Sequence, residues 1–224
     1  GYGLVVNPDK IRDIGDLERT DVRLGCVREG GATDVFLRKT IEIYGLDEET
    51  VLNRVQRMNP PQQILAIRTG QLDAAFLPEQ WATMAEDLGF EMLLTGRDVW
   101  PGMQGSVLVV KESLLEENPE AVERLIEVSR RATEWLNQHP DEAASIMARQ
   151  LSVTGQKVLP VEAAQVAAEL EITPAVLLRS MNRLEYTTAL TPSAVQEMID
   201  YVAEKGYIRE RFAAADILDL RFLR

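Results

Sequence analysis

The stretch "VRLGCVREGGATDVFLRKTIEIYG", residues 22–45, joins two different patterns. Its first six residues form a short apolar run of the kind found in strands covered on both faces, whereas apolar residues recur at helical spacing from Thr33 onward. Gly30 and Gly31 lie between the two patterns. The stretch therefore predicts a strand, a tight turn and a helix, which together form a building unit of an α/β sheet.

The flanking sequence repeats this unit. "PPQQILAIRTG" from Pro60 has helical spacing, "LDAAFL" from Leu72 is an apolar run of strand length, and "EQWATMAEDLG" from Glu79 is helical again. Further strands are predicted from "GYGLVV" at residues 1–6, "EMLLTG" at 91–96 and "GSVLVV" at 105–110. These patterns favour an α/β sheet fold.

The C-terminal half is predicted to be nearly all helix. Three pairs of residues act as stop signals that divide it: Asn118-Pro119, His139-Pro140 and Thr173-Pro174. The chain contains no Ser/Gly linker and no short-period repeat. Any division into lobes therefore runs through strand crossings, which would form a hinge.

The composition excludes several classes of function. Of 224 residues, 46 % are hydrophobic and 27 % are charged, which is typical of ordinary folded proteins. The formal charge of -12 repels a phosphate backbone, so nucleic acid is not an expected partner. No run reaches the roughly 20 apolar residues of a membrane span, so we expect no direct membrane insertion. Cys26 and His139 are the only residues of their kinds. We therefore expect no internal disulfide, no metal and no cofactor.

The turn after the first buried strand is a candidate ligand site. Glycines at 30 and 31 let backbone N–H groups approach a ligand closely, and Thr33 could cap the helix or donate its hydroxyl to an anionic oxygen. Arg28 could neutralise that anion. The alternative is an ordinary tight turn with Thr33 as the N-cap. The stretch matches neither the G-x-G-x-x-G fingerprint nor a nucleotide-triphosphate loop.

"FLPEQWA" from Phe76 is a second strand-to-helix junction. Glu79, Gln80 and Trp81 could supply an acceptor, a donor and an aromatic wall. The alternative is that Glu79 only favours the helix dipole, while Trp81 packs in the core.

Four other residues have both a functional and a structural interpretation or a structural one alone. In "VWPGMQG", Trp100 and Met103 could line a cleft, and a plain loop is the alternative. Cys26 lies in an apolar strand and is predicted to be a small buried hydrophobe. His139 precedes a proline and is predicted to lie at a solvated helix end without a chemical role.

Several stretches in order resemble the solute-binding proteins of ABC importers for nitrate, sulfonates, taurine and thiamin-precursor pyrimidines, the NMT1/THI5-like or SsuA-like family. The resemblance is carried by "IRDIGDLE", "VRLGCVREGGATDVFLRKTIEIYGLD", "MNPPQQILAIRTGQLDAAFLPEQWATMAEDLG", "VWPGMQGSVLVVKESLLEENPEAV", "LEYTTALTPSAVQEMIDYVAEKGYI" and "AADILDLRFL". The order of "GQLDAAFLPEQWA", "WPG", a strand and "NPEAV" is moderately specific to that family.

The resemblance implies a type II periplasmic-binding fold of two lobes joined by a hinge. Residues 1–20 would form a strand and crossover of the first lobe, residues 21–97 the second α/β lobe, and residues 98–224 the return to the first lobe with the C-terminal helices. Members of the family begin with a strand and helices that have no counterpart before Gly1, so the first lobe is expected to lack its N-terminal part.

The resemblance also implies a function. It implies a periplasmic or extracytoplasmic protein, not an enzyme, that captures a small polar or anionic solute and delivers it to an ABC permease in the membrane. The implied ligand contacts are Gly30, Gly31, Ala32, Thr33, Pro78, Glu79, Gln80, Trp81, Trp100 and Met103, with Gln63 as a further candidate.

Two other functions stay open at this point. The first is an enzyme on the same scaffold, since relatives of the family include a thiamin-pyrimidine synthase and a sulfinate-cleaving hydrolase, with Cys26 and Arg28 as its candidate centre. A cysteine-rich motif and a spare active-site histidine are not visible in the sequence. The second is a solute-sensing module that regulates a membrane partner other than a permease.

Overall fold

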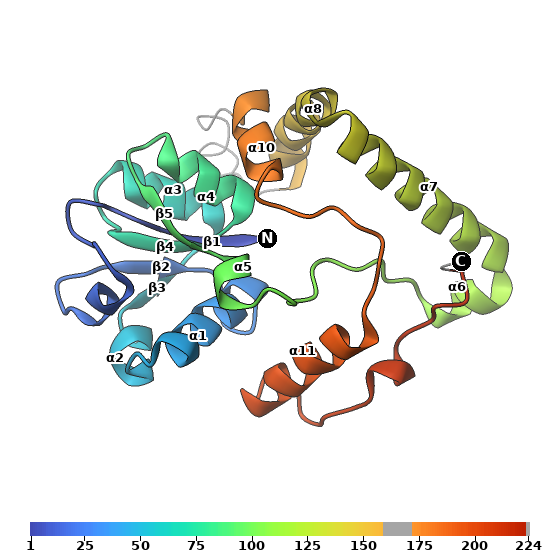
Figure 1. Cartoon of the computed structure of the whole chain (residues 1–224), viewed down its shortest axis with the longest axis horizontal. Helices are drawn as coiled ribbons and strands as arrows, with labels where there is room; N and C mark the ends of the chain where they lie inside the picture. The colour runs from blue at the N-terminus through green and yellow to red at the C-terminus, as the bar shows by residue number, and fades with distance from the viewer. Residues whose placement is uncertain (159–171, 223–224) are drawn as a thin grey trace. The chain divides into compact units, whose positions relative to one another are not determined.

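The computed structural model describes residues 1–158 and 172–222, with side chains described for 1–151 and 172–222 (Figure 1). These residues form two compact units. Unit 1 comprises Gly1–Pro101 and Ala143–Leu184, and unit 2 comprises Gly102–Glu142 and Glu185–Arg224. The lobe boundaries expected after residues 20 and 97 stay a prediction.

Unit 1 is built on a five-stranded sheet. In chain order, its strands are β1 (Tyr2–Val6), β2 (Leu24–Cys26), β3 (Val55–Arg57), β4 (Ala74–Pro78) and β5 (Glu91–Thr95). The spatial order is β3-β2-β4-β1-β5. β2 is parallel to β3 and β4, and β1 is antiparallel to β4 and β5. The predicted α/β sheet is thus confirmed as a mixed sheet.

Helices follow the strands at positions that the local sequence favours. In the first 101 residues, the helical elements are η1 (Ile14–Glu18), α1 (Ala32–Tyr44), α2 (Glu48–Leu52), α3 (Pro60–Arg68), α4 (Glu79–Glu86) and α5 (Gly96–Val99). Asp47 and Asn59 cap α2 and α3 with their side chains, and α3 begins with proline. Gly45 ends α1 with φ 65°, the left-handed conformation that favours glycine at a helix C-terminus.

The remaining helices confirm the three predicted stop signals. They are α6 (Glu112–Glu117), α7 (Pro119–Gln138), α8 (Pro140–Val158), α10 (Pro174–Met181), α11 (Pro192–Glu204) and η2 (Ala214–Asp216). Pro119, Pro140 and Pro174 each begin a helix, where a missing backbone N–H costs nothing. His139 ends α7 as predicted, with its ring stacked on Trp135 at 5.0 Å.

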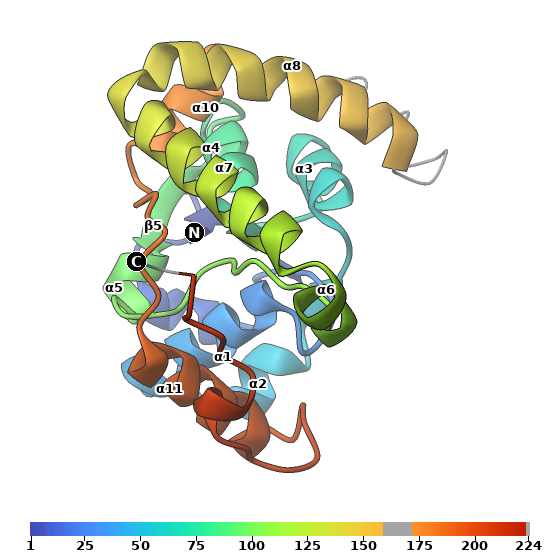
Figure 2. The same cartoon turned by 90° about the vertical axis from the view of Figure 1, so that its right-hand side faces the viewer.

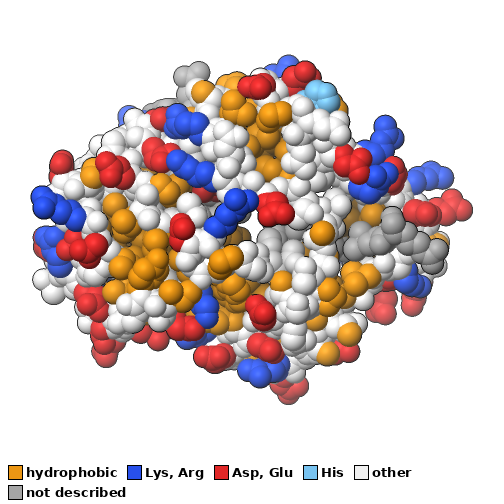
Figure 3. All heavy atoms as spheres, viewed as in Figure 1, with side chains coloured by type: hydrophobic (Ala, Val, Ile, Leu, Met, Phe, Trp, Pro, Cys, Tyr) orange, Lys and Arg blue, Asp and Glu red, His pale blue; other side chains and the backbone are white. Residues whose placement is uncertain are grey.

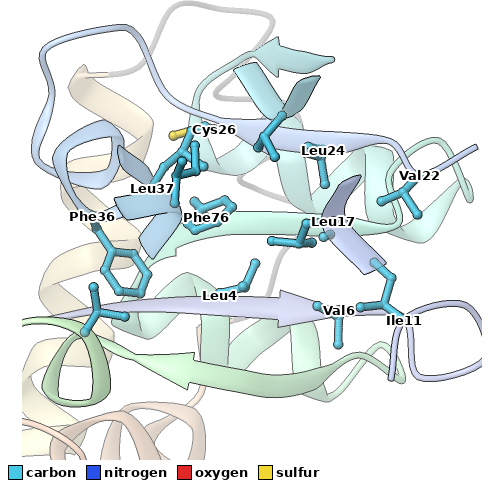
Figure 4. Packing of buried hydrophobic residues seen from close by; sticks show 14 residues of the cluster. Leu4, Val6, Ile11, Leu17, Val22, Leu24, Cys26, Phe36, Leu37 and Phe76 are labelled. Atoms are coloured by element: carbon cyan, nitrogen blue, oxygen red, sulfur yellow. The ribbon is translucent and has the colours of Figure 1, made fainter. Parts of the chain in front are cut away.

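The sheet of unit 1 is covered on both faces. One hydrophobic cluster joins alternate strand residues such as Leu4 and Phe76 to Phe36 and Leu37 of α1 (Figure 4). The other cluster joins the intervening strand residues Val5 and Leu77 to α3 and α4. α10 packs against α4 on this second side (Figure 2). Burial on both faces is the reason that the strands read as continuous apolar runs.

Two strand assignments need correction. β3 (Val55–Arg57) was missed because Gln56 and Arg57 are polar and exposed at the edge of the sheet, so the strand has no apolar run. The strand predicted at 105–110 is wrong, because these residues pair with no strand in the described part of the chain. Val107, Leu108 and Val109 are exposed. β propensity alone does not make a strand without a partner.

A buried carboxylate ties together the amino ends of two parallel strands. Asp73, directly before β4, has a side chain that is 1 % exposed. Its Oδ2 accepts hydrogen bonds from Arg23 N and Nε at 3.0 and 2.8 Å, and its Oδ1 accepts from Lys10 Nζ at 2.7 Å and Arg23 Nη2 at 2.8 Å. Asn7, just past β1, donates its N–H to the Asp73 carbonyl. The start of β2, the start of β4 and the end of β1 therefore meet at one residue, Asp73.

Unit 2 has a small core of its own. Val195 and Ile199 of α11 pack against Ala214 of η2. Asn137 on α7 donates to the Tyr186 carbonyl at 2.9 Å, which links α7 to the segment before α11.

On the face seen in Figure 3, acidic and basic side chains lie interspersed rather than in one basic field.

Candidate functional site

The carboxyl ends of β2 and β4 form a topological switch point. The two strands are parallel neighbours, so their carboxyl ends lie at the same edge of the sheet. β2 leads to α1, which packs on one face, whereas β4 leads to α4, which packs on the other. In open α/β sheets, ligands bind beyond carboxyl ends at such a divergence. Both junctions singled out in the sequence lie here.

The amino terminus of α1 has open backbone donors. Its N-cap is Gly31, which has no side chain to cap the helix, so Thr33 is not the N-cap. The N–H groups of Asp34 and Val35 both donate to the Gly31 carbonyl. Those of Ala32 and Thr33 have no acceptor among the described residues. Two aligned N–H groups at the positive end of a helix favour an anion.

The turn itself requires its glycines. Gly30 has φ 71°, which a residue with a side chain adopts only with strain. A Cβ on Gly31 would lie 3.2 Å from the Arg28 carbonyl oxygen, a tight contact with backbone. The Arg28 side chain is exposed beside this turn.

Asp34, which the sequence analysis missed, holds the turn in place. Its carboxylate is fully buried and accepts from Gly30 N at 3.2 Å, Arg38 Nε at 3.3 Å and Arg57 Nη1 at 2.5 Å. The Gly30 N–H is therefore engaged within the protein. An acidic residue in the first turn of a predicted helix after two glycines was the available signal.

Thr33 is 2 % exposed, and its hydroxyl oxygen accepts from the Cys26 thiol at 3.9 Å. The hydroxyl thus faces the interior, and the backbone N–H is the donor of Thr33 that has no acceptor among the described residues. The neighbouring Ala32 is exposed. This end of α1 therefore presents backbone rather than side-chain donors.

At the second junction, Glu79 begins α4 after the N-cap Pro78. Its side chain is 2 % exposed, accepts from Thr83 Oγ1 at 2.9 Å and lies 3.4 Å from Arg183 Nη1. Burial raises the pKa of Glu79 above its ordinary value, while the hydrogen bond from Thr83 and the charge of Arg183 oppose the shift. Glu79 is an inward-facing acceptor.

The other predicted contacts differ in setting. Pro78, Gln80 and Trp81 are half-buried, and Trp81 also packs against the cluster under α3 and α4. Trp100 is half-buried in unit 1, where Lys39 Nζ lies 5.4 Å from its ring centroid. Met103 belongs to unit 2.

Gln63 is fully buried on α3. Its Nε2 donates to the Met58 carbonyl at 3.0 Å, and its Oε1 has no hydrogen-bond partner in the described part of the chain. A Cβ on Gly25 would lie 3.0 Å from that oxygen. Gln63 therefore packs against β2, beneath the surface.

Cys26 is fully buried at the end of β2, as the sequence predicted. Burial raises the pKa of the Cys26 thiol to about 12, although the nearby charge of Arg57 opposes the shift. A thiol with such a pKa is not a nucleophile at neutral pH.

We expect Cys26 to resist thiol reagents in the native protein. At pH 8, its reaction with 5,5′-dithiobis(2-nitrobenzoate) should be at least about 100-fold slower than in urea, because only opened molecules expose the thiolate. Absorbance at 412 nm measures the rate. Complete labelling of the folded protein within minutes would show that Cys26 is accessible and reactive.

Among the residues that the structure describes, no three His, Cys, Asp or Glu side chains are grouped so as to hold a metal ion. Within the same residues, no helix is both long and apolar enough to cross a membrane.

Comparison with known proteins identifies the family. A model described as the NMT1-like family matches residues 7–152. The chain belongs to the NMT1-like family. A Brucella abortus relative, named as a binding protein, is 27 % identical over 155 residues, which cover 66 % of this chain and 46 % of the relative. This NMT1-like chain thus spans about half of that relative.

Solved structures show the fold of the NMT1-like chain. The periplasmic aliphatic sulphonate binding protein SsuA from Escherichia coli aligns with TM-score 0.72 and 15 % identity, covering 100 % of this chain and 70 % of SsuA. The nitrate-binding protein NrtA from Synechocystis aligns with TM-score 0.64 and 17 % identity, covering 93 % and 58 %. The desulfurization enzyme DSZB aligns with TM-score 0.63 and 15 % identity, covering 99 % and 74 %. The fold is therefore that of the periplasmic binding proteins.

Proposed function

We propose that the chain is part of an extracytoplasmic solute-binding protein that captures a small polar or anionic solute for an ABC importer. The observation that carries this proposal is the amino terminus of α1, where Ala32 and Thr33 present open N–H groups at the switch point of the sheet. Membership of the NMT1-like family and the fold shared with SsuA and NrtA support it.

The solute is held mainly by backbone donors under this proposal. An anionic group accepts from the N–H groups of Ala32 and Thr33, and exposed Arg28 adds a positive charge. From the second junction, Pro78, Gln80 and Trp81 add contacts around the solute, with Glu79 as a buried acceptor.

The remaining predicted contacts have different roles. Trp100 of unit 1 is a further contact that the family resemblance implies, and the contact implied at Met103 stays a prediction. Gln63, being fully buried, supports the site from below rather than touching the solute. A permease in the membrane is the partner that receives the solute.

An enzymatic function has less support. Its candidate nucleophile, Cys26, is fully buried with a raised pKa. The likeness to DSZB at 15 % identity concerns the fold alone. A solute-sensing module would use the same binding site, and isolation of the chain with a permease would distinguish the importer from it.

A thermal-unfolding screen tests the proposal. The probes are nitrate, bicarbonate, methanesulfonate, taurine, phthalate and an aminopyrimidine. A solute at about 100 times its Kd stabilises the folded state by roughly 2.7 kcal/mol, which raises the midpoint by about 5 to 10 °C for a chain of this size. Turnover of the bound solute by the purified chain would contradict a binding protein.

Ala32→Pro sharpens the test. Proline at the first helical position lacks only the N–H, and Gly31 before it has φ -78° and ψ 162°, which a following proline permits. We expect solute affinity to fall about 10- to 100-fold, since a hydrogen bond to a charged group is lost. Glu112→Pro, at the first position of α6, is the matched control that should bind normally. Equal binding by both variants would rule out the α1 terminus as the site.

A further inference from the structure

Two buried carboxylates lie at opposite ends of the sheet of unit 1. Asp34 lies at the carboxyl end of β2 and Asp73 at the amino end of β4, with side chains 0 % and 1 % exposed. Each uses both oxygens, and each binds two cationic side chains and one backbone N–H. The two sites are chemically alike, but only Asp34 adjoins the proposed solute site.

The bonds of Asp34 fix the turn at two points. One carboxylate oxygen, Oδ2, accepts the Gly30 N–H. The other, Oδ1, accepts from Arg57 Nη1, and the same Nη1 donates to the Val27 carbonyl at 2.8 Å. Val27 and Gly30, the two ends of the turn before the N-cap, are thereby joined through one carboxylate–guanidinium pair.

Arg57 connects the carboxylate of Asp34, and with it the turn, to strand β3 of the sheet. It is the last residue of β3, and its register partner on β2 is Cys26, directly before Val27. The guanidinium therefore starts from a rigid position beside the strand that feeds the turn. Arg38 adds a second cation on Asp34 and also pairs with Glu29 in the turn, at 3.0 Å.

A turn containing Gly30 and Gly31 has many accessible conformations. We propose that the Asp34–Arg57 pair is a positioning device that fixes residues 27–31, so that the N–H groups of Ala32 and Thr33 point together at the solute. Asp34 itself does not touch the solute. This inference rests on the proposed function, because it assigns the pair a role in solute affinity.

The sign of the effect separates positioning from simple electrostatics. By Coulomb attraction alone, removing the Asp34 charge makes the end of α1 more positive and tightens binding of an anion. Positioning predicts the opposite. Asparagine has one acceptor oxygen where the carboxylate uses two, so Asp34→Asn must release either Gly30 or Arg57.

The experiment compares Asp34→Asn with Asp73→Asn in the full chain. Titration calorimetry with methanesulfonate and with nitrate gives the affinity, and circular dichroism checks the fold. We expect Asp34→Asn to weaken binding at least about 10-fold, as for a lost charge-assisted hydrogen bond, while Asp73→Asn stays within about twofold of the unchanged chain. Unchanged or tighter binding by Asp34→Asn overturns the proposal, as does equal weakening in both variants.

A second measurement needs no solute. Amide hydrogen exchange at Gly30 should accelerate at least about 10-fold in Asp34→Asn and stay unchanged in Asp73→Asn. If the unchanged chain binds none of the six probes of the thermal-unfolding screen, the proposed function fails, while exchange still decides whether the pair fixes the turn. If Asp34→Asn does not fold, Arg57→Lys takes its place, because a single ammonium cannot reproduce the planar guanidinium contacts. Equal exchange at Gly30 in variant and unchanged chain overturns the positioning role.

Discussion

Phe76→Ala is expected to lower the free energy of unfolding by about 3 to 5 kcal/mol. Phe76 is fully buried in β4, the central strand, and packs edge-to-face on Phe36 of α1 with ring centroids 5.7 Å apart. Truncation removes the transfer free energy of the ring and leaves a cavity between the sheet and α1. No neighbouring strand can move in to fill it, because β1 and β2 pair with β4 on both sides.

Urea unfolding followed by circular dichroism measures this loss. Phe212→Ala is the matched control, since it makes the same chemical change at a side chain that is 39 % exposed in unit 2. The control should cost less than about 1 kcal/mol. Similar losses in the two variants would mean that Phe76 is not part of a packed core.

The sequence predicted those features that local pattern determines. The apolar runs that became β1, β2 and β4 are buried on both faces, so each strand carries its own signal. The glycine turn before α1 was also visible, because left-handed backbone at Gly30 has a residue-type signature. Both strand-to-helix junctions of the candidate site were therefore found without the structure.

Features that depend on distant residues were not predictable in this way. Asp34 meets Arg57 from 23 residues away, and Glu79 meets Arg183 from 104 residues away. The sequence shows that a carboxylate is present but not which arginine or lysine forms an ion pair with it. The same reason explains the strand wrongly predicted at 105–110, since strand formation requires a partner elsewhere in the chain.

Asp73→Asn is expected to lower the free energy of unfolding by about 2 to 3 kcal/mol at pH 7. The side chain binds Arg23 at the start of β2 and Lys10 in the segment after β1, and asparagine cannot accept all four hydrogen bonds through one oxygen. The cost stays below that of a fully buried ion pair because Lys10 and Arg23, with side chains 42 % and 40 % exposed, can be hydrated after the change.

At low pH, the difference in free energy of unfolding between Asp73→Asn and the unchanged chain should become smaller. Burial acts to raise the pKa of Asp73, but the hydrogen bonds from Arg23 and Lys10 outweigh it and hold the pKa well below its usual range. The unfolded chain, with a pKa of about 3.9, binds this proton first, so the contribution of Asp73 is complete above about pH 5 and declines as pH falls toward the folded pKa. Urea unfolding at pH 7 and pH 3 should therefore show a smaller gap between Asp73→Asn and the unchanged chain at pH 3. A gap of equal size at both pH values would mean that the charge of Asp73 contributes nothing, and that its hydrogen-bonding shape alone holds the strand ends together.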